Sequence, residues 1–367
     1  MTIRRLTLSD LAFGEPLRWD VFGPSKAASP VLHKGQVIAP SPQLEGWLAA
    51  GLYAEAAPPV SVLQCLNRLN RRLESTLMEL RTQTSADTEL RQIAHELIAA
   101  VDRAPDVALA CIFLNQIAGL YAVRHCVEAG IVVALIGRAM GKPAEELLTV
   151  TAAALTMNVG MVRQTEMFQC KDCALTHEER AMVRRHPTES ADLLRYVGVD
   201  DPAWIDYVLL HHENEDGTGY PEGRQGGEIP QNAKLIALAD RYCAFVSARN
   251  YRRSLLPNVA LDKLCGDGDI PADAAIRALF KTRIGAYPPG TLVRLACGDI
   301  GVVSRGADAD GTLGLHALRT AAGGTLSPPQ PRLSSESGSA IVEALHEDQV
   351  GIRFSMKHVW GELASLS

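Results

Sequence analysis

The chain has 367 residues, 47% of them hydrophobic and 21% charged, which is typical of a globular protein with two or three domains and a sizeable core. Its formal net charge of −6 argues against general binding to DNA or RNA. Eight cysteines without a secretory signal indicate reduced thiols. The apolar run from Val107 to Val123 is interrupted by Asn115 and Gln116, which argues against a membrane span. We therefore expect a cytoplasmic protein that binds neither nucleic acid nor membrane.

Residues 1–58 are predicted to form a small α/β module. Short strands near 17–22 and 35–38 are separated by turns, and Ser41-Pro42 opens a short helix that Gly51 closes. No group of potential ligands is found in this segment. We interpret the module as structural or partner-binding.

Helical patterns dominate residues 59–283, so the predicted fold class is mainly α, a helical bundle flanked by two small β-containing modules. Apolar residues recur at spacings of three and four on the first two helices. They are Val62, Leu66, Leu69, Leu73 and Leu77, then Leu90, Ile93, Leu97 and Ala100. These stripes favour packing within one bundle, with the seam of a dimer as the alternative, and the sequence does not fix the oligomeric state.

Further helices are predicted at about 106–123, 125–140, 143–158, 177–195, 202–212 and 231–252. Two of them have clear start signals. Thr176 with Glu179 fits a capping box, and Asp201 precedes a proline at the first helical position.

Residues 284–367 are predicted to form a small β-module. Strands are expected near 291–295, 300–304, 313–318 and 340–345. Residues 320–339 are rich in Gly, Ser and Pro, which predicts a flexible loop.

The stretch from Leu210 to Pro221 is the most informative part of the chain, and it reads Leu-His-His-Glu-Asn-Glu-Asp-Gly-Thr-Gly-Tyr-Pro. Histidine is the commonest protein ligand of transition metals, and two adjacent histidines reduce the entropy lost in assembling a site. Gly217 and Gly219 allow backbone conformations that other residues resist, so the chain can fold closely over whatever the histidines hold. The string therefore predicts a metal site beside a tight turn.

This string resembles the second motif of the HD-GYP family, a bacterial branch of the HD phosphohydrolase superfamily, and the resemblance extends over about residues 120–255. It implies an HD-type all-α bundle, a centre of iron or manganese, and hydrolysis of cyclic di-GMP by a metal-bound hydroxide. It also implies contacts between the Gly-Tyr-Pro surface and diguanylate cyclase (GGDEF) domains in signal transduction.

The resemblance assigns five metal ligands to separate parts of the bundle. They are His125, His186, His211, His212 and Asp240. Any one of them alone is more often a core or surface residue than a ligand, but five at the family's spacing favour a shared site.

The dyad that names the superfamily is absent. Where the family has Ala-Leu-Leu-His-Asp-Ile-Gly-Lys, residues 154–161 read Ala-Leu-Thr-Met-Asn-Val-Gly-Met, so Met157 and Asn158 replace the histidine and the aspartate. A thioether is a poor ligand for iron or manganese, and a neutral amide cannot bridge two cations as a carboxylate does. Met161 replaces a lysine that meets substrate phosphate, and Tyr121 stands where some members have a further acidic ligand. We therefore expect one divalent transition metal ion, with Asn158 as a candidate oxygen ligand, and no full two-metal centre.

The residues implied to contact a nucleotide are better preserved. Tyr220 matches the motif tyrosine, whose ring can stack on guanine. Arg249 and Arg252 match the family's Arg-Pro-Tyr-Arg segment and can hold a phosphate. The alternative interpretation of these arginines is a solvated basic helix end.

Cys170 and Cys173 form a CxxC motif, and His177 follows it. Three such donors can bind zinc, and the two thiols can also form a redox pair. Because there is no second CxxC, coincidence is the favoured interpretation.

The sequence thus predicts a degenerate HD-GYP protein that acts as a cyclic di-GMP receptor or a protein-interaction module, with phosphodiesterase activity weak or absent. The alternative is a working phosphodiesterase that uses one metal ion. A scaffold that binds neither metal nor nucleotide is the third hypothesis, and the retained histidines argue against it.

Overall fold

The structure, a computed structural model, describes residues 3–6, 17, 20–23, 29–39, 41–55, 60–82, 86–168, 171, 173–247, 253–266 and 272–366. The chain divides into two compact units, residues 1–59 and residues 60–367. Among the described residues, none of the helices combines the length and the apolar character that a membrane crossing requires.

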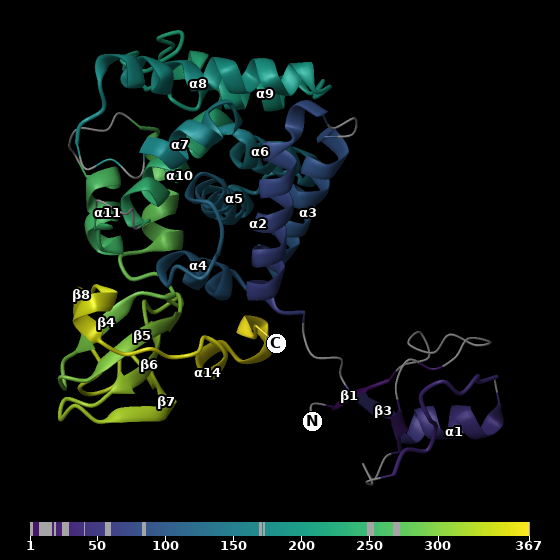
Figure 1. The fold of residues 1–367 in the computed structure, drawn as a ribbon. Coiled ribbons are helices and arrows are strands. Elements are labelled where there is room, and N and C mark those ends of the chain that lie inside the picture. Colours follow the sequence, from purple (N-terminus) through teal and green to yellow (C-terminus); the bar gives the residue numbers. More distant parts are fainter. Residues whose placement is uncertain are drawn as a thin grey trace. The chain divides into compact units, whose positions relative to one another are not determined.

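The described residues of the N-terminal unit form a three-stranded antiparallel sheet and one helix, α1 (Pro42–Ala50) (Figure 1). The strands are β1 (Ile3–Arg5), β2 (Val21–Phe22) and β3 (Tyr53–Glu55), in the order β1-β3-β2. The Ser41 hydroxyl accepts a hydrogen bond from the Leu44 amide at 3.2 Å, which caps α1. The helix ends at Gly51, whose φ is 105°. This is the small α/β module that the sequence predicts.

The second unit begins with a helical bundle. Its helices are α2 (Val62–Met78), α3 (Ala86–Arg103), α4 (Pro105–Phe113), α5 (Tyr121–Ala139), α6 (Ala144–Thr156), α7 (Val162–Phe168), α8 (His177–Tyr196), α9 (Pro202–Leu210), α10 (Gln231–Val246), α11 (Pro257–Cys265) and α12 (Ala274–Leu279). Short 3-10 segments cover Leu80–Thr82, Val159–Met161, Gly226–Glu228 and Gly361–Ala364, and a π-helical turn covers Phe280–Ile284. α5 runs through the middle of the bundle, with α2, α3, α6 and α10 packed around it (Figure 1). The mainly α fold class is confirmed.

The apolar stripes predicted on the first two helices are buried inside this bundle. Leu66 and Leu69 on α2 are completely buried. Leu90 and Leu97 on α3 are also completely buried, and all four residues belong to one hydrophobic core. Because both stripes face the inside of the bundle, they are not available as the seam of a dimer.

The two predicted helix starts are present. The Thr176 hydroxyl accepts a hydrogen bond from the Glu179 amide at 3.2 Å, and the Glu179 carboxylate accepts one from the Thr176 amide at 2.9 Å. The Asp201 carboxylate accepts hydrogen bonds from the first turn of α9. These caps fix where α8 and α9 begin.

The prediction of one continuous helix over residues 106–123 is wrong, because the loop 114–120 separates α4 from α5. Asn115 in this loop has a φ of 51°, which a helix does not allow. The Asn70 side chain on α2 donates a hydrogen bond to the Ala118 carbonyl at 2.7 Å and holds the loop against the bundle. The polar residues that interrupt the apolar run therefore mark a loop, and this loop sets where α5 begins.

The C-terminal part is a five-stranded antiparallel sheet with the strand order β7-β6-β5-β4-β8 (Figure 1). The strands are β4 (Leu292–Leu295), β5 (Ile300–Arg305), β6 (Gly314–Arg319), β7 (Thr325–Leu333) and β8 (Ile341–Leu345). Two short helices follow, α13 (Glu347–Val350) and α14 (Lys357–Trp360). The C-terminal β-module is therefore confirmed.

The prediction of a flexible loop over residues 320–339 is wrong for the central part of this segment, where the chain forms β7 and pairs with β6. The segment contains Pro328, Pro329 and Pro331, a composition typical of loops. β7 is at the edge of the sheet, and an edge strand tolerates prolines because one of its sides needs no hydrogen-bond donors.

The sheet packs against the helical bundle within the second unit. The Ser61 hydroxyl, just before α2, donates a hydrogen bond to the Ser365 carbonyl at 2.7 Å. Gly290, just before β4, has a φ of 97° and passes so close to α4 that a Cβ there would lie 2.7 Å from the Cα of Ala110. A side chain at residue 290 would therefore separate the sheet from the bundle.

Gly290→Ala is expected to reduce the free energy of unfolding by roughly 2–4 kcal/mol. A positive φ costs an L-residue about 1 kcal/mol, and crowding against α4 adds about 1–3 kcal/mol. Gly311 also has a positive φ, 78°, but a Cβ there meets nothing within 4 Å, so Gly311→Ala measures the backbone cost alone. Chemical denaturation of both variants checks this, and equal losses would contradict the close approach at Gly290.

Candidate metal centre

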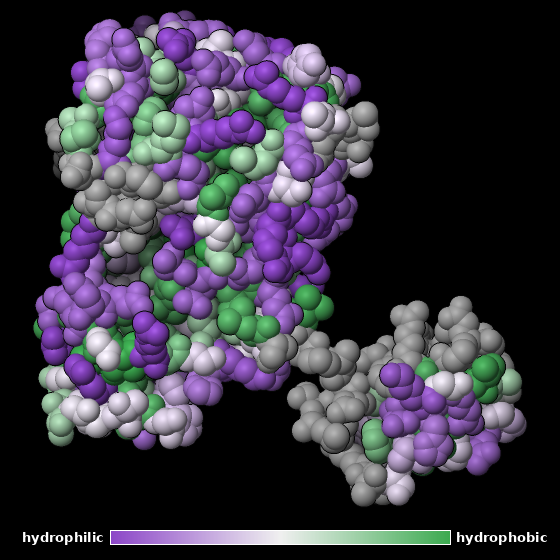
Figure 2. All heavy atoms as spheres, in the orientation of Figure 1, coloured by the Kyte–Doolittle hydropathy of each residue, from purple (hydrophilic) through white to green (hydrophobic). Residues whose placement is uncertain are grey.

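Residues from α5, α8 and α10 and from the segments after α6 and α9 meet at one cavity of about 540 Å³. The polar residues that line it include His125, Asn158, His186, His212 and Asp240. Hydrophilic side chains predominate on the outer surface over α8 and α9 (Figure 2). The cavity thus brings together residues as far apart in the chain as His125 and Asp240, which are separated by 115 positions.

His186 on α8 and His211 at the end of α9 face each other through their ring nitrogens. Nδ1 of His186 donates to the Val183 carbonyl at 2.5 Å, and Nδ1 of His211 donates to the Val208 carbonyl at 2.7 Å. A carbonyl only accepts, so both Nδ1 atoms carry the proton and both Nε2 atoms carry a lone pair. The two Nε2 atoms are 3.3 Å apart. Two neutral rings in this arrangement cannot form a hydrogen bond with each other, because neither Nε2 atom carries a proton. A cation, in contrast, can bind both nitrogens.

His212 completes a cluster of three histidines. The ligand nitrogens of His186, His211 and His212 all lie within 4.8 Å of one another, which is close enough to share one ion. Burial, and then the neighbouring His211, lowers the pKa of His186 to about 3. Burial also lowers the pKa of His211 and, together with the nearby imidazole of His211, that of His212. All three rings are therefore neutral at pH 7, which is the form that binds metal.

His125 on α5 and Asp240 on α10 form a buried pair with 2.7 Å between Nε2 and Oδ1. Burial raises the pKa of Asp240, but the hydrogen bond and charge of His125, with the other imidazoles, outweigh it and hold that pKa below its usual range. Tyr121 stacks on His125, with ring centroids 5.7 Å apart. Among the described residues that line the cavity, Asp240 is the one carboxylate.

Met157 and Asn158, which the sequence predicts to replace the dyad, have different surroundings. Asn158 lines the cavity, whereas Met157 is completely buried in the core of the bundle. The backbone here is held against α8, because the Gly160 amide donates to the Ser190 hydroxyl at 2.9 Å and a Cβ on Gly160 would lie 2.8 Å from the Ser190 amide nitrogen. The cavity therefore receives a neutral amide from this segment and no charge.

The glutamate of the His-His-Glu string holds the following turn together. Glu213 is buried, and its Oε1 accepts hydrogen bonds from the amides of Glu222 at 2.7 Å and Gly223 at 3.1 Å. Gly219 packs beneath it, where a Cβ would lie 2.5 Å from the Cα of Glu213. The turn folds as closely over the histidines as the glycines predict.

Tyr220 lies at the wall of the cavity beside His212. Their ring centroids are 4.8 Å apart with an interplanar angle of 27°. The guanidinium carbon of Arg184 lies 4.7 Å from the centroid of the Tyr220 ring. A guanine base that stacked on this ring would compete with Arg184.

Two arginines near the cavity, Arg184 and Arg241, were not predicted from the sequence. The Arg241 guanidinium donates a hydrogen bond to the side-chain oxygen of Asn214. Burial lowers the pKa of Arg241, and the charge of Asp240 opposes this change. The sequence offers one feature that points to these arginines: each is within two residues of a predicted metal ligand.

Arg249 and Arg252, which the sequence predicts to hold a phosphate, lie outside the described residues. The helix predicted to reach residue 252 ends at Val246, because Ser247 has an extended backbone. The phosphate contacts stay a prediction.

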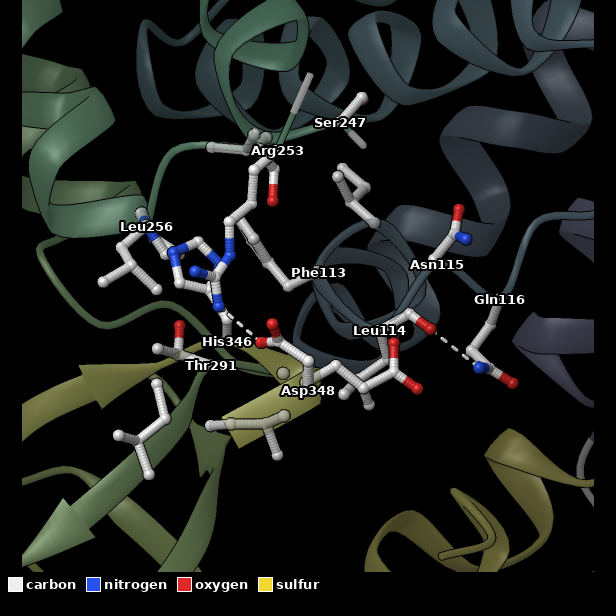
Figure 3. A pocket seen from close by; sticks show the side chains of 18 of the residues that line it. Phe113, Leu114, Asn115, Gln116, Ser247, Arg253, Leu256, Thr291, His346 and Asp348 are labelled. Atoms are coloured by element: carbon white, nitrogen blue, oxygen red, sulfur yellow. Dashed lines mark hydrogen bonds and ion pairs between the residues drawn. The ribbon is translucent and has the colours of Figure 1, made fainter. Parts of the chain in front are cut away.

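A second and larger cavity, of about 940 Å³, lies between the bundle and the sheet (Figure 3). Arg253 and Asp348 form an ion pair on its wall. Glu128 of α5 also lines it and accepts a hydrogen bond from the Ser247 hydroxyl at 2.5 Å. The described lining of this cavity includes none of the three clustered histidines, so the candidate metal centre belongs to the smaller cavity.

Comparison with known proteins gives three findings. The HD domain family model matches residues 114–270. A cyclic di-GMP phosphodiesterase of Pseudomonas aeruginosa is 28% identical over 238 residues, which cover 65% of this chain and 57% of that protein. A cyclic di-GMP phosphodiesterase response regulator of Xanthomonas campestris pv. campestris is 33% identical over 135 residues, or 35% of each chain. The match therefore spans less than two thirds of either relative.

A solved structure shows the same fold. An HDG"Y"P protein from Bdellovibrio bacteriovorus aligns with a TM-score of 0.51 at 12% identity, over 76% of this chain and 98% of that one. The HD domain family model therefore covers the helices around the histidine cluster, and over these helices the chain is similar to cyclic di-GMP phosphodiesterases.

In the metal-free chain, lowering the pH from 7 to 5 is expected to reduce the free energy of unfolding by roughly 1–2 kcal/mol through His186. The unfolded chain protonates this histidine near pH 6.5, whereas the folded chain does so only near pH 3, so falling pH favours unfolding across that interval. His186→Asn should weaken the pH dependence, and His177→Asn, at an exposed position on the same helix, should not. Chemical denaturation at both pH values checks this. Identical pH dependence in the parent and in His186→Asn would contradict a buried neutral imidazole.

Proposed function

We propose that this chain is a degenerate HD-GYP protein of bacterial cyclic di-GMP signalling. It binds the nucleotide at the histidine cavity and regulates a partner, with phosphodiesterase activity impaired or absent. The observation that supports the proposal is the chemistry of the segment that we align with the dyad. Asn158 presents a neutral amide to the cavity, and Met157 is buried in the core. The named functions of its relatives suggest cyclic di-GMP as the ligand.

Charge supports a single metal ion at this centre. Two divalent cations bring four positive charges, and the neutral imidazoles of His186, His211 and His212 compensate none of them. Asp240 adds one negative charge, which suits one ion but leaves a large excess for two. We propose His186, His211 and His212 as ligands of one iron or manganese ion, with His125, Asp240 and Asn158 as further candidates.

Loss of the second ion explains why hydrolysis should fail while binding survives. Two-metal hydrolysis of a phosphodiester needs one ion on the attacking hydroxide and another on the leaving oxygen. A single ion still attracts the phosphate of a nucleotide. The cavity volume of about 540 Å³ falls within the usual range for ligand pockets.

The nucleotide contacts we propose are Tyr220, Arg249 and Arg252. Tyr220 lines the cavity beside His212, which supports a base contact close to the metal. We also propose that the exposed surface around Pro221 contacts a diguanylate cyclase domain or another signalling protein. That surface is rigid, because Glu213 and Gly219 hold the turn from within.

Isothermal titration of the metal-loaded chain with cyclic di-GMP, combined with chromatography of the products, tests the proposal. We expect binding without turnover in the presence of iron or manganese. His212→Ala should weaken binding, and the exposed His177→Ala should not. Turnover that disappears in His212→Ala would make the protein an enzyme instead, and absence of both binding and turnover would leave a scaffold.

Restoring the dyad with Met157→His and Asn158→Asp is expected to raise metal content from one ion towards two and to create turnover. Residue 157 is completely buried, so without metal the new imidazole should cost roughly 1–3 kcal/mol of stability. Added manganese should reverse that loss. Asn158→Asp alone is the control, since it adds the carboxylate without the buried ring. Unchanged metal content in the double variant would contradict the view that the missing dyad limits this centre.

A further inference from the structure

The larger cavity, between the helical bundle and the C-terminal sheet, has apolar walls on both sides (Figure 3). Phe113 and Leu114 line it at the end of α4, and Leu256 lines it just before α11. Ile352 and Phe354 line it from the segment between α13 and α14. Its volume of about 940 Å³ falls within the usual range for ligand pockets, so it has room for a small molecule with an apolar body.

Direct contacts hold the walls of this cavity in place. The Asp106 carboxylate on α4 accepts a hydrogen bond from the Gly306 amide, just after β5, at 3.2 Å. The Leu255 amide donates to the Phe245 carbonyl at 2.8 Å, which fixes the segment before α11 against α10. Gly290, which lines the cavity, makes the close approach to α4 described above. The cavity is therefore formed before any ligand binds.

Glu128 on α5 presents a buried carboxylate to this cavity. It is 1% exposed, and among the described lining it is the one charged side chain that is almost fully buried. One of its oxygens accepts the hydrogen bond from Ser247, and the other lies 3.4 Å from Nε of Arg124. Burial raises the pKa of Glu128, so these two partners do not offset the loss of water. A carboxylate has about four acceptor positions, which leaves capacity for a further donor.

The other charged side chains of the described lining cancel one another. They are exposed, and two carry each sign: Arg253, Arg353, Glu347 and Asp348. Burial and the nearby charge of Arg253 lower the pKa of His346, so this imidazole is neutral at pH 7. The uncancelled charge of the described lining is therefore the negative charge of Glu128, which favours a positive ligand group over an anion.

We propose that this cavity is a second binding site, which takes a small organic amine with its ammonium group on Glu128 and its apolar body against Phe113 and Leu256. An ammonium donates charge-assisted hydrogen bonds to a carboxylate, and an aromatic ring such as that of Phe113 attracts a cation to its face. Binding changes no covalent bond. The site goes beyond the proposed function, because it requires neither the metal ion nor cyclic di-GMP.

The proposed amine site shares a helix with the candidate metal centre. Glu128 and His125 are both on α5, three positions apart, and they line different cavities. An amine on Glu128 would therefore contact the helix that holds one of the candidate metal ligands.

Isothermal titration of the full chain at pH 7 with 2-phenylethylamine and with hexylamine tests the proposal, since alkylamines are protonated at this pH. Two matched probes change the head group: 2-phenylethanol is neutral, and 3-phenylpropanoate is an anion. We expect at least one amine to bind, and we expect the alcohol and the carboxylate to bind on the order of tenfold or more weakly. Glu128→Gln should weaken amine binding by about tenfold or more. The matched control is Glu336→Gln, which changes an exposed glutamate outside the described lining and should leave the affinity unchanged.

Leu256→Trp is a second variant that fills the cavity and leaves Glu128 in place, and it should abolish amine binding. Circular dichroism identifies the variants that fold, and if Glu128→Gln does not fold, Leu256→Trp decides the question. Failure of both amines to bind the parent chain would overturn the proposal, and so would equal affinity for the anionic probe. Parent affinity in a folded Glu128→Gln or Leu256→Trp variant would overturn it as well.

Discussion

The two facing imidazoles of His186 and His211 are the constraint on which the centre depends. Each Nδ1 proton is committed to a backbone carbonyl of the same helix, so each Nε2 is left as an acceptor. Burial makes protonation of either ring unfavourable. The two Nε2 atoms are both acceptors and lie 3.3 Å apart, so neither can donate a hydrogen bond to the other. The packing of α8 against α9 imposes this geometry, and a cation bound between the two rings would relieve it.

The same geometry shows what the centre lacks. Asn158 brings a neutral amide to the cavity, and Met157 belongs to the core and not to the cavity. Asp240 offsets one positive charge, which suits one divalent ion better than two. In the function we propose, the single metal ion and the loss of hydrolysis both follow from the charge of the cavity.

Much of this arrangement could be predicted from the sequence, because histidines at family spacing and capping signals are local patterns. The structure brings His125 and Asp240 into hydrogen-bond contact although they are 115 positions apart, which the resemblance anticipated and periodicity could not. Composition predicts a loop where β7 forms, because composition does not reveal that a proline-rich segment lies at a sheet edge.

The central claim is that the histidine cavity holds one metal ion and not two. The most direct test is the metal content of the chain after reconstitution with excess iron or manganese and removal of the unbound ion, measured by mass spectrometry of the elements. We expect one ion per chain, lost when His211 is replaced by alanine. Two ions per chain would contradict the claim, and so would a content unaffected by that substitution.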